Sequence, residues 1–173
     1  FFFIFFFIIF FLGLGVCAFF EGKFLILRTQ SKGKTPYSQK MTFPFQVGKW
    51  YCVCVSHTSK FIGKDEVSLY VDGMLKLRVN LGYPKVDTAL KSSFIGCCNN
   101  GANPLIGQIG SFYLIESTVD DEMAHVLNQL GVGGIEDATV GGNTIKSSNK
   151  SLKLVLCFNP KACQGNSCVE TAR

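Results

Sequence analysis

The side chains best suited to chemistry lie close together near residue 50. Cys52, Cys54 and His57 fall in one short stretch, and a thiol beside an imidazole is an arrangement that can activate a nucleophile. Cys52 and Cys54 are two residues apart, so in a strand they point to the same face. His57 has no identifiable serine or cysteine partner. We therefore expect His57 to pack in the core or at a strand end, and we predict no catalytic residue and no enzymatic activity.

The eight cysteines do not form a recognisable disulfide or metal framework. Cys97 and Cys98 are adjacent, a pairing that would strain the peptide, and Cys52 and Cys54 cannot bridge each other without distortion. The chain has no CxxC pair and only two histidines, so it lacks the ligand spacing of a zinc site. These features predict free thiols in a reducing compartment and no cofactor. The even number of cysteines leaves open an oxidised, extracellular protein.

A calcium or sugar site is the second kind of site that the residues allow. Asp72, Asn99 and Asn100 could supply the oxygen ligands that hard cations use. The same residue types also stabilise backbone turns, and we favour that interpretation, with no metal bound. Trp50 opens a stretch that is apolar on both faces of a strand, so we expect it to fill the core rather than to stack on a sugar.

Charge and composition narrow the classes of function. The net charge is +5, from 17 basic and 12 acidic residues, and the basic residues are scattered along the chain. Nucleic-acid-binding proteins usually gather such residues into a patch, so we expect no nucleic-acid partner. A chain of 173 residues that is 47% hydrophobic can form one domain with a substantial core.

The elements that must position these residues are strands. Apolar side chains recur at every second position in residues 67–71, Asp72-Gly73 interrupts the pattern, and it resumes over residues 75–79. A DG pair between two alternating runs predicts a hairpin with a type I′ turn, because Gly accepts a positive φ. Further strands are expected at residues 23–29, 39–45, 50–57, 93–97, 109–115 and 152–158. The strand over 50–57 is expected to be central and buried. Strands at this spacing, with no helices between them, predict an antiparallel sandwich.

One helix is expected after residue 116. Ser117 or Thr118 can cap it, the cluster 120–122 (Asp-Asp-Glu) suits the positive end of its dipole, and Gly131 can end it. His125 lies off its apolar face, which we expect to pack on the sandwich and which consists of Val119, Met123, Val126, Leu127 and Leu130. Residues 131–142 are glycine-rich, residues 143–151 are polar, and residues 159–173 are expected to be loosely ordered.

The first twenty residues differ from the rest, since positions 1–11 contain only Phe and Ile. A helix of twenty apolar residues would span about 30 Å, enough for a bilayer core. No basic residue precedes the run, so it is a poor secretory signal. Two interpretations stay open. The segment is a membrane anchor, with Lys23 and Arg28 favouring a cytoplasmic position for its C-terminal side, or it is translated T-rich non-coding DNA, which we favour.

Several motifs occur in an order that resembles one family. They are the strand from Trp50 to His57, the LYVDG hairpin at 69–73, FIG at 94–96, IGQIGSFYL at 106–114, LG at 130–131 and FNPKAC at 158–163. Together they resemble the concanavalin A-like domain of BEACH-domain proteins, the family of neurobeachin, Alfy and the lysosomal-trafficking regulator, from about Phe19 to the C-terminus. The motif residues are Trp50, His57, Tyr70, Asp72, Gly73, Gly96, Gly107, Gln108, Gly110 and Gly131. We expect Gly107, Gln108 and Gly110 at a strand entry where the backbone approaches closely.

The resemblance implies an all-β, antiparallel concanavalin A-like jelly-roll sandwich with one short C-terminal helix, lacking its first strands. We divide the chain into an apolar segment at 1–18, the sandwich at 19–131, and a linker and extension at 132–173. The resemblance also implies a non-enzymatic interaction module of a large cytoplasmic scaffold in vesicle traffic, lysosomes or autophagy. The partners would be proteins or neighbouring domains, contacted through the exposed second face of the sheet, with peripheral or N-terminal membrane association.

Two alternatives come from other classes of protein. One is a carbohydrate-binding, laminin-G-like module of an extracellular or membrane-anchored protein. The other is a degenerate glycan hydrolase, since glucanases share the concanavalin A-like fold and use paired carboxylates. Those enzymes resemble one another in an ExDxE or ExDxxE strand, and no acidic residue here falls in that pattern. The hydrolase is therefore the least favoured.

Overall fold

The computed structural model of the chain describes residues 2–8, 15–31, 33–85, 107–115, 117–130, 144–146 and 151–158. The strands are β1 (Phe2–Ile8), β2 (Val16–Glu21), β3 (Phe24–Thr29), β4 (Tyr37–Met41), β5 (Trp50–Thr58), β6 (Glu66–Val71), β7 (Met74–Asn80), β8 (Gly107–Ile115), β9 (Thr144–Lys146) and β10 (Ser151–Phe158). The helix described is α1 (Asp121–Leu130). The structure is an all-β sandwich, as the alternating pattern predicted.

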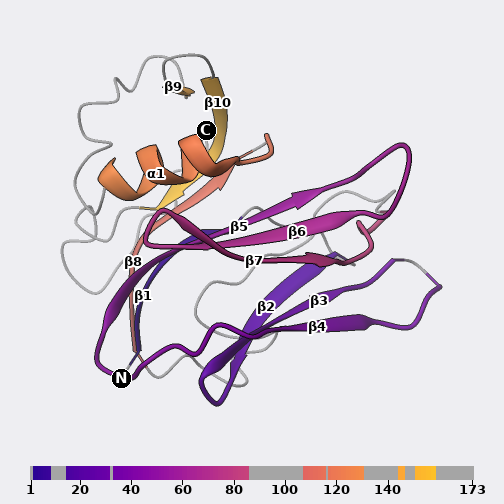
Figure 1. The fold of residues 1–173 in the computed structure, drawn as a ribbon, viewed down its shortest axis with the longest axis horizontal. Coiled ribbons are helices and arrows are strands. Elements are labelled where there is room, and N and C mark those ends of the chain that lie inside the picture. Colours follow the sequence, from indigo (N-terminus) through magenta and orange to yellow (C-terminus); the bar gives the residue numbers. More distant parts are fainter. Residues whose placement is uncertain are drawn as a thin grey trace.

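Two sheets and the helix form three layers. The larger sheet has the order β7-β6-β5-β1-β8-β10-β9, and the smaller has the order β2-β3-β4. Figure 1 shows α1 on one side of β5 and β6 and the three-stranded sheet on their other side. All described strand pairs are antiparallel except those of β1, which lies parallel to both β5 and β8.

Two apolar cores follow from the alternation of side chains along β5 and β6. The core between the two sheets contains Leu25, Leu27 and Met41 from the small sheet, opposite Val53, Val55, Val67 and Leu69. The core beneath α1 contains Cys54, Tyr70, Val119, Met123 and Leu127. Because β5 and β6 are covered on both faces, the prediction of a central buried strand at 50–57 is confirmed. The same burial means that β5 and β6 have no exposed second face for a partner.

The hairpin predicted around Asp72-Gly73 is confirmed. Asp72 has a φ of 53° and Gly73 a φ of 76°, the two positive values that a type I′ turn requires. The alternation predicted for residues 75–79 is interrupted by a bulge, because Leu77 pairs with Leu69 but Leu75 pairs with Tyr70. Lys76 is the extra residue, and Leu75 therefore lies on the helix side of the sheet.

Several predicted boundaries were wrong. The strand expected at 39–45 begins at Tyr37 and ends at Met41, after which the Phe45 N–H donates to the Lys23 carbonyl oxygen at 2.8 Å. The strand at 23–29 is confirmed as β3, but two strands precede it. Residues 144–146, expected to be a polar linker, form β9 and pair with β10. The strand expected at 152–158 is confirmed as β10, which pairs with β8.

The N-terminal run is not a helix in this structure. Residues 2–8 and 16–21 are strands, so a helical anchor over residues 1–20 is not supported. Within the described ranges, no helix is long and apolar enough to cross a bilayer. The strand expected at 93–97, the turn at 99–104 and the segments 131–142 and 159–173 lie outside the described residues.

Candidate functional site

Asp72 and Gly73 serve the hairpin and the packing of the helix. The Cys52 N–H donates to Asp72 Oδ1 at 2.9 Å, and the Asp72 N–H donates to the Cys52 carbonyl oxygen at 2.8 Å. A Cβ on Gly73 would lie 3.0 Å from the Asn128 Cβ and 3.2 Å from the His125 Cα. Glycine is therefore required here both by the positive φ and by the approach of α1.

The calcium candidate is not assembled in the described residues. The Asp72 carboxylate bonds to the backbone of β5, and Asn99 and Asn100 lie outside the described residues. No group of three or more His, Cys, Asp or Glu residues in the described ranges could hold a metal ion. The candidate stays a prediction. Gly96 and Gly131 also lie outside the described residues.

Trp50 does not fill the core, so that prediction was wrong. Its side chain is 45% exposed. The pairing of β5 with β6 begins at Val53, opposite Val71, so Trp50 extends beyond the end of the hairpin, where it pairs with Phe3 of β1. Apolar side chains on both faces of a strand therefore do not show that other elements pack over every residue of that strand.

Cys52 and Cys54 are unsuited to nucleophilic chemistry. Cys54 is buried and Cys52 is half-buried. Burial, with a smaller effect of the Asp72 charge, raises the pKa of the Cys52 thiol to about 12. Burial and then Cys52 raise the pKa of Cys54 still further. The reactive thiolate is therefore absent near neutral pH.

His57 packs at the end of β5, as predicted. Its Nε2–H donates to the Leu81 carbonyl oxygen at 2.8 Å, and its ring lies 4.8 Å from the Tyr83 ring, centroid to centroid. Burial lowers the pKa of His57, and the Leu81 carbonyl and the Asp65 charge oppose that shift. His57 belongs to the face of β5 opposite Cys54, so the two cannot form a catalytic pair.

Tyr70 and the acidic cluster hold the helix on the sheet. The Tyr70 hydroxyl lies 3.1 Å from Asp121 Oδ1 and 3.4 Å from the Val119 carbonyl oxygen. Asp120 caps the helix, since the Met123 N–H donates to its Oδ1 at 3.0 Å. Ser117 and Thr118, the predicted caps, lie too far upstream. His125 is exposed, as expected.

The glycines near residue 110 lie in β8. Gly107 and Gln108 pair with Phe2 and Phe3 of β1, and the register shifts between the next pairs, where buried Gly110 has no direct partner. Gly107 and Gln108 therefore stand at the entry of β8, as expected, whereas Gly110 is its fourth residue. A glycine at such an irregularity allows close backbone approach.

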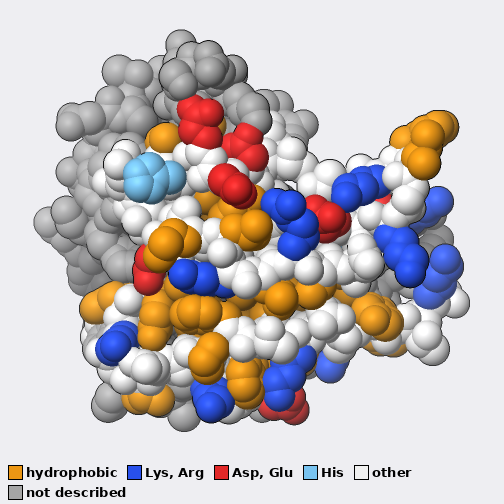
Figure 2. Space-filling view, viewed as in Figure 1, with side chains coloured by type: hydrophobic (Ala, Val, Ile, Leu, Met, Phe, Trp, Pro, Cys, Tyr) orange, Lys and Arg blue, Asp and Glu red, His pale blue; other side chains and the backbone are white. Residues whose placement is uncertain are grey.

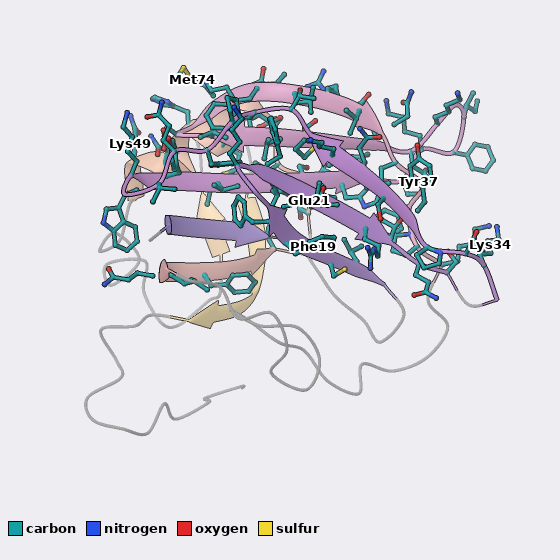
Figure 3. All side chains as sticks on the ribbon, turned by 90° about the horizontal axis from the view of Figure 1, so that it is seen from below. Phe19, Glu21, Lys34, Tyr37, Lys49 and Met74 are labelled. Carbon is teal, nitrogen blue, oxygen red and sulfur yellow. The ribbon has the colours of Figure 1, made fainter. Side chains whose placement is uncertain are left out.

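The three-stranded sheet has one face turned away from the core, which we call the outer sheet face. Its register aligns Phe19, Ile26 and Lys40 in one row and Cys17, Arg28 and Ser38 in the next. Ile26, in the middle of this face, is buried, Phe19 is half-buried, and Arg28 and Lys40 are exposed. A third row pairs Glu21 with Phe24, and Figure 3 labels Phe19 and Glu21 along β2. The opposite side chains of these strands, such as Leu25 and Leu27, enter the core between the sheets.

Cations lie over the aromatic rings of the outer sheet face. The Arg28 guanidinium is 5.0 Å from the centroid of Phe19, and the Lys40 ammonium is 4.1 Å from the centroid of Phe24. Arg28 Nε also donates to Ser38 Oγ at 3.0 Å. Such a surface can bind an acidic partner through its cations and apolar groups through its rings. The sequence analysis missed it, although the alternation of residues 24–29 carries the signal.

Comparisons with known proteins give two partial similarities. The chain is 28% identical over 165 residues to BEACH domain-containing protein lvsE of Dictyostelium discoideum, a match that covers 87% of the chain and 7% of that protein. It is 32% identical over 99 residues to BEACH domain-containing protein B of Arabidopsis thaliana, covering 48% of the chain and 4% of that protein. No family model and no solved structure matches the chain. These similarities support a relationship between this chain and a small segment of BEACH domain-containing proteins.

Proposed function

We propose that this chain is a non-catalytic interaction module of a BEACH-type protein, folded as a concanavalin A-like sandwich. The observation that supports it is the match over 165 residues to a BEACH domain-containing protein. In this proposal the parent protein is a cytoplasmic scaffold acting in vesicle traffic, lysosomes or autophagy. The chain spans only 7% and 4% of the length of the two relatives. In this proposal it therefore supplies one of several domains of such a protein.

The roles of the polar side chains are consistent with a module that does not catalyse a reaction. Asp72 bonds to the backbone of β5, His57 bonds to the carbonyl oxygen of Leu81, and Asp120 caps α1. Each of these groups is engaged by the fold itself. A general acid or base must instead reach a substrate from a cleft.

The outer sheet face is the contact surface in this proposal. It carries the exposed Arg28 and Lys40 over the half-buried rings of Phe19 and Phe24. Aromatic and Arg side chains are enriched where proteins bind one another. The excess of cations on this face favours a partner segment rich in Asp and Glu.

A charge-reversal experiment tests the proposal. The full chain would be immobilised as wild type, as the double variant Arg28→Glu/Lys40→Glu, and as the control Lys49→Glu, whose residue lies at one end of the molecule in Figure 3. Trafficking or autophagy proteins captured by wild type and by the control should be lost from the double variant. Equal capture by all three chains would refute the assignment of this face, and capture of no such protein by wild type would refute the function. Sugar binding on a glycan array would favour the carbohydrate-binding alternative instead.

A further inference from the structure

The loop between β5 and β6, residues 59–65, ends in an apolar tip. We call this segment the tip loop. Phe61 is 104% exposed and Ile62 is 85% exposed, the two highest values among the large hydrophobic side chains described. Figure 1 shows the loop projecting beyond both sheets, and Figure 2 shows hydrophobic atoms at the end of this projection. Two adjacent apolar side chains are thus held away from the rest of the protein.

Hydrogen bonds to Asp65 hold the base of the tip loop. The Lys60 N–H donates to Asp65 Oδ1 at 3.0 Å, and the Tyr83 N–H donates to Asp65 Oδ2 at 2.7 Å. The Leu81 N–H donates to the Asp65 carbonyl oxygen at 3.1 Å. The tip loop is therefore joined to segment 81–85, and binding through it would need less ordering than binding through an unsupported loop.

Lysines surround the apolar tip. Lys60 immediately precedes Phe61, Lys64 follows Ile62 after Gly63, and both lysines are exposed. Lys85 belongs to the adjoining segment 81–85. Its backbone N–H donates to Ser31 Oγ at 3.1 Å, so the loop between β3 and β4 lies at the same end of the molecule. That loop carries the exposed Lys34, labelled in Figure 3.

The acidic residues of this end do not cancel its positive charge. Glu66 contacts both the Lys60 Nζ at 2.9 Å and the Arg78 Nε at 3.2 Å. Asp65 is directed at the backbone N–H groups that lower the pKa of its carboxyl, first that of Tyr83 and then that of Lys60. Among the described residues, four lysines and two carboxylates therefore give this end a net positive charge near neutral pH.

We propose that the tip loop inserts Phe61 and Ile62 into the interfacial region of a membrane containing anionic lipids, while the surrounding lysines contact lipid headgroups. A membrane fits the observations better than a protein. Two convex side chains bury far less than the roughly 800 Å² per partner of a standard protein interface, whereas a bilayer needs no complementary pocket. Apolar anchors with nearby lysines suit the negative surface of a bilayer. This role goes beyond the protein-contact function of the outer sheet face.

Vesicle sedimentation tests the proposal with the full chain. The probes are phosphatidylcholine vesicles with and without phosphatidylserine. Wild type should bind the vesicles that contain phosphatidylserine, and Phe61→Ser/Ile62→Ser should lower the partition coefficient at least about tenfold. Lys64→Glu should lower it about fivefold or more. The matched control is Met74→Ser, which removes a 57% exposed apolar side chain at the start of β7, beside the turn at the other end of β6, and should leave binding unchanged.

A depth measurement adds a second readout. Phe61→Trp in a Trp50→Phe background places a single indole at the tip, because the chain has one Trp. Its fluorescence should shift to the blue and be quenched by lipids that carry a quencher on the acyl chain. An unshifted, unquenched indole would overturn the insertion.

The remaining outcomes also decide the proposal. Failure of wild type to bind either kind of vesicle, or an equal loss of binding with Met74→Ser, would overturn it. Capture of a protein that depends on Phe61 and Ile62 without vesicle binding would overturn it in favour of protein docking. The tip variant should still capture the partners of the outer sheet face, so this proposal and the proposed function can fail separately.

Discussion

Ser56 fastens the segment before α1 to the larger sheet. Its side chain is 2% exposed, and its Oγ accepts a hydrogen bond from the Val119 N–H at 2.9 Å. Val119 is itself buried, so Ser56→Ala would leave that N–H without a partner and away from water. An unsatisfied buried donor costs more than the net value of an average hydrogen bond.

The expected loss is about 2 kcal/mol of unfolding free energy, from the ~1–3 kcal/mol cost of an unsatisfied buried group. For a chain of this size the loss corresponds to a fall of about 4–8 °C in Tm. Urea unfolding followed by circular dichroism measures it, and the denaturant dependence should match that of wild type. Hydrogen exchange should also accelerate at the start of α1, where the lost bond acts.

Ser68→Ala is the matched control. Ser68 lies directly opposite Ser56 in the pairing of β5 with β6 and is 7% exposed. Its Oγ accepts from Arg78 Nε at 3.2 Å, but Arg78 also contacts Glu66 and is exposed to water. We expect Ser68→Ala to change stability by no more than about 0.5 kcal/mol. Equal losses in the two variants would refute the reasoning, because they would show that burial of the hydroxyl matters and its partner does not.

Three further predictions concern single groups. Cys17 is exposed and should be alkylated in the folded chain at pH 8. Cys54 is buried, and Cys52 is half-buried with a pKa raised to about 12, so both should react only after denaturation. Peptide mapping of the alkylated chain would show the difference. Asp120→Ala should cost about 0.5–2 kcal/mol in urea unfolding, and Asp120→Ser should restore most of it. Because burial lowers the pKa of folded His57 below its ordinary 6.5, the unfolded chain binds the proton first. Stability should therefore fall as the pH drops below 6.5, and His57→Gln should flatten that part of the profile in denaturant titrations at a series of pH values.

Local rules predicted the strands and turns that depend on neighbouring residues. The hairpin was predictable because Asp72-Gly73 specifies the two positive φ angles and the flanking alternation specifies the face. The central position of β5 was predictable because both of its faces are apolar. In each case the signal lies within about ten residues of the element that it describes.

The N-terminal run shows where such rules fail. A continuous apolar stretch suits a membrane helix and a buried strand equally well, because it has no hydrophobic periodicity that would distinguish the two. Residues 2–8 gain strand partners only from β5 and β8, which begin nearly 50 and more than 100 residues later. That parallel pairing depends on the assembled sheet. Trp50 failed for a related reason, because its exposure depends on where β6 ends.

The helix cap shows a smaller failure of the same kind. Ser117, Thr118 and Asp120 all have side chains that can cap a helix, so residue type could not choose among them. The Val119 N–H bonds to Ser56 in β5, a contact between segments far apart in the sequence that residue type near the helix does not reveal. The first turn then starts after Asp120, whose Oδ1 accepts from Met123.

Phe61 and Ile62 give a last prediction that separates folding from binding. Both are almost fully exposed and belong to neither apolar core, so replacing them with Ser should change the unfolding free energy by no more than about 0.5 kcal/mol. Leu69→Ala, which empties a fully buried position, should cost about 2–5 kcal/mol in the same urea titration. A large loss of stability in the tip variant would show that these side chains support the fold, and lost vesicle binding could then not be assigned to the membrane. A variant with unchanged stability that no longer binds vesicles would show that Phe61 and Ile62 serve in binding the membrane and not in folding.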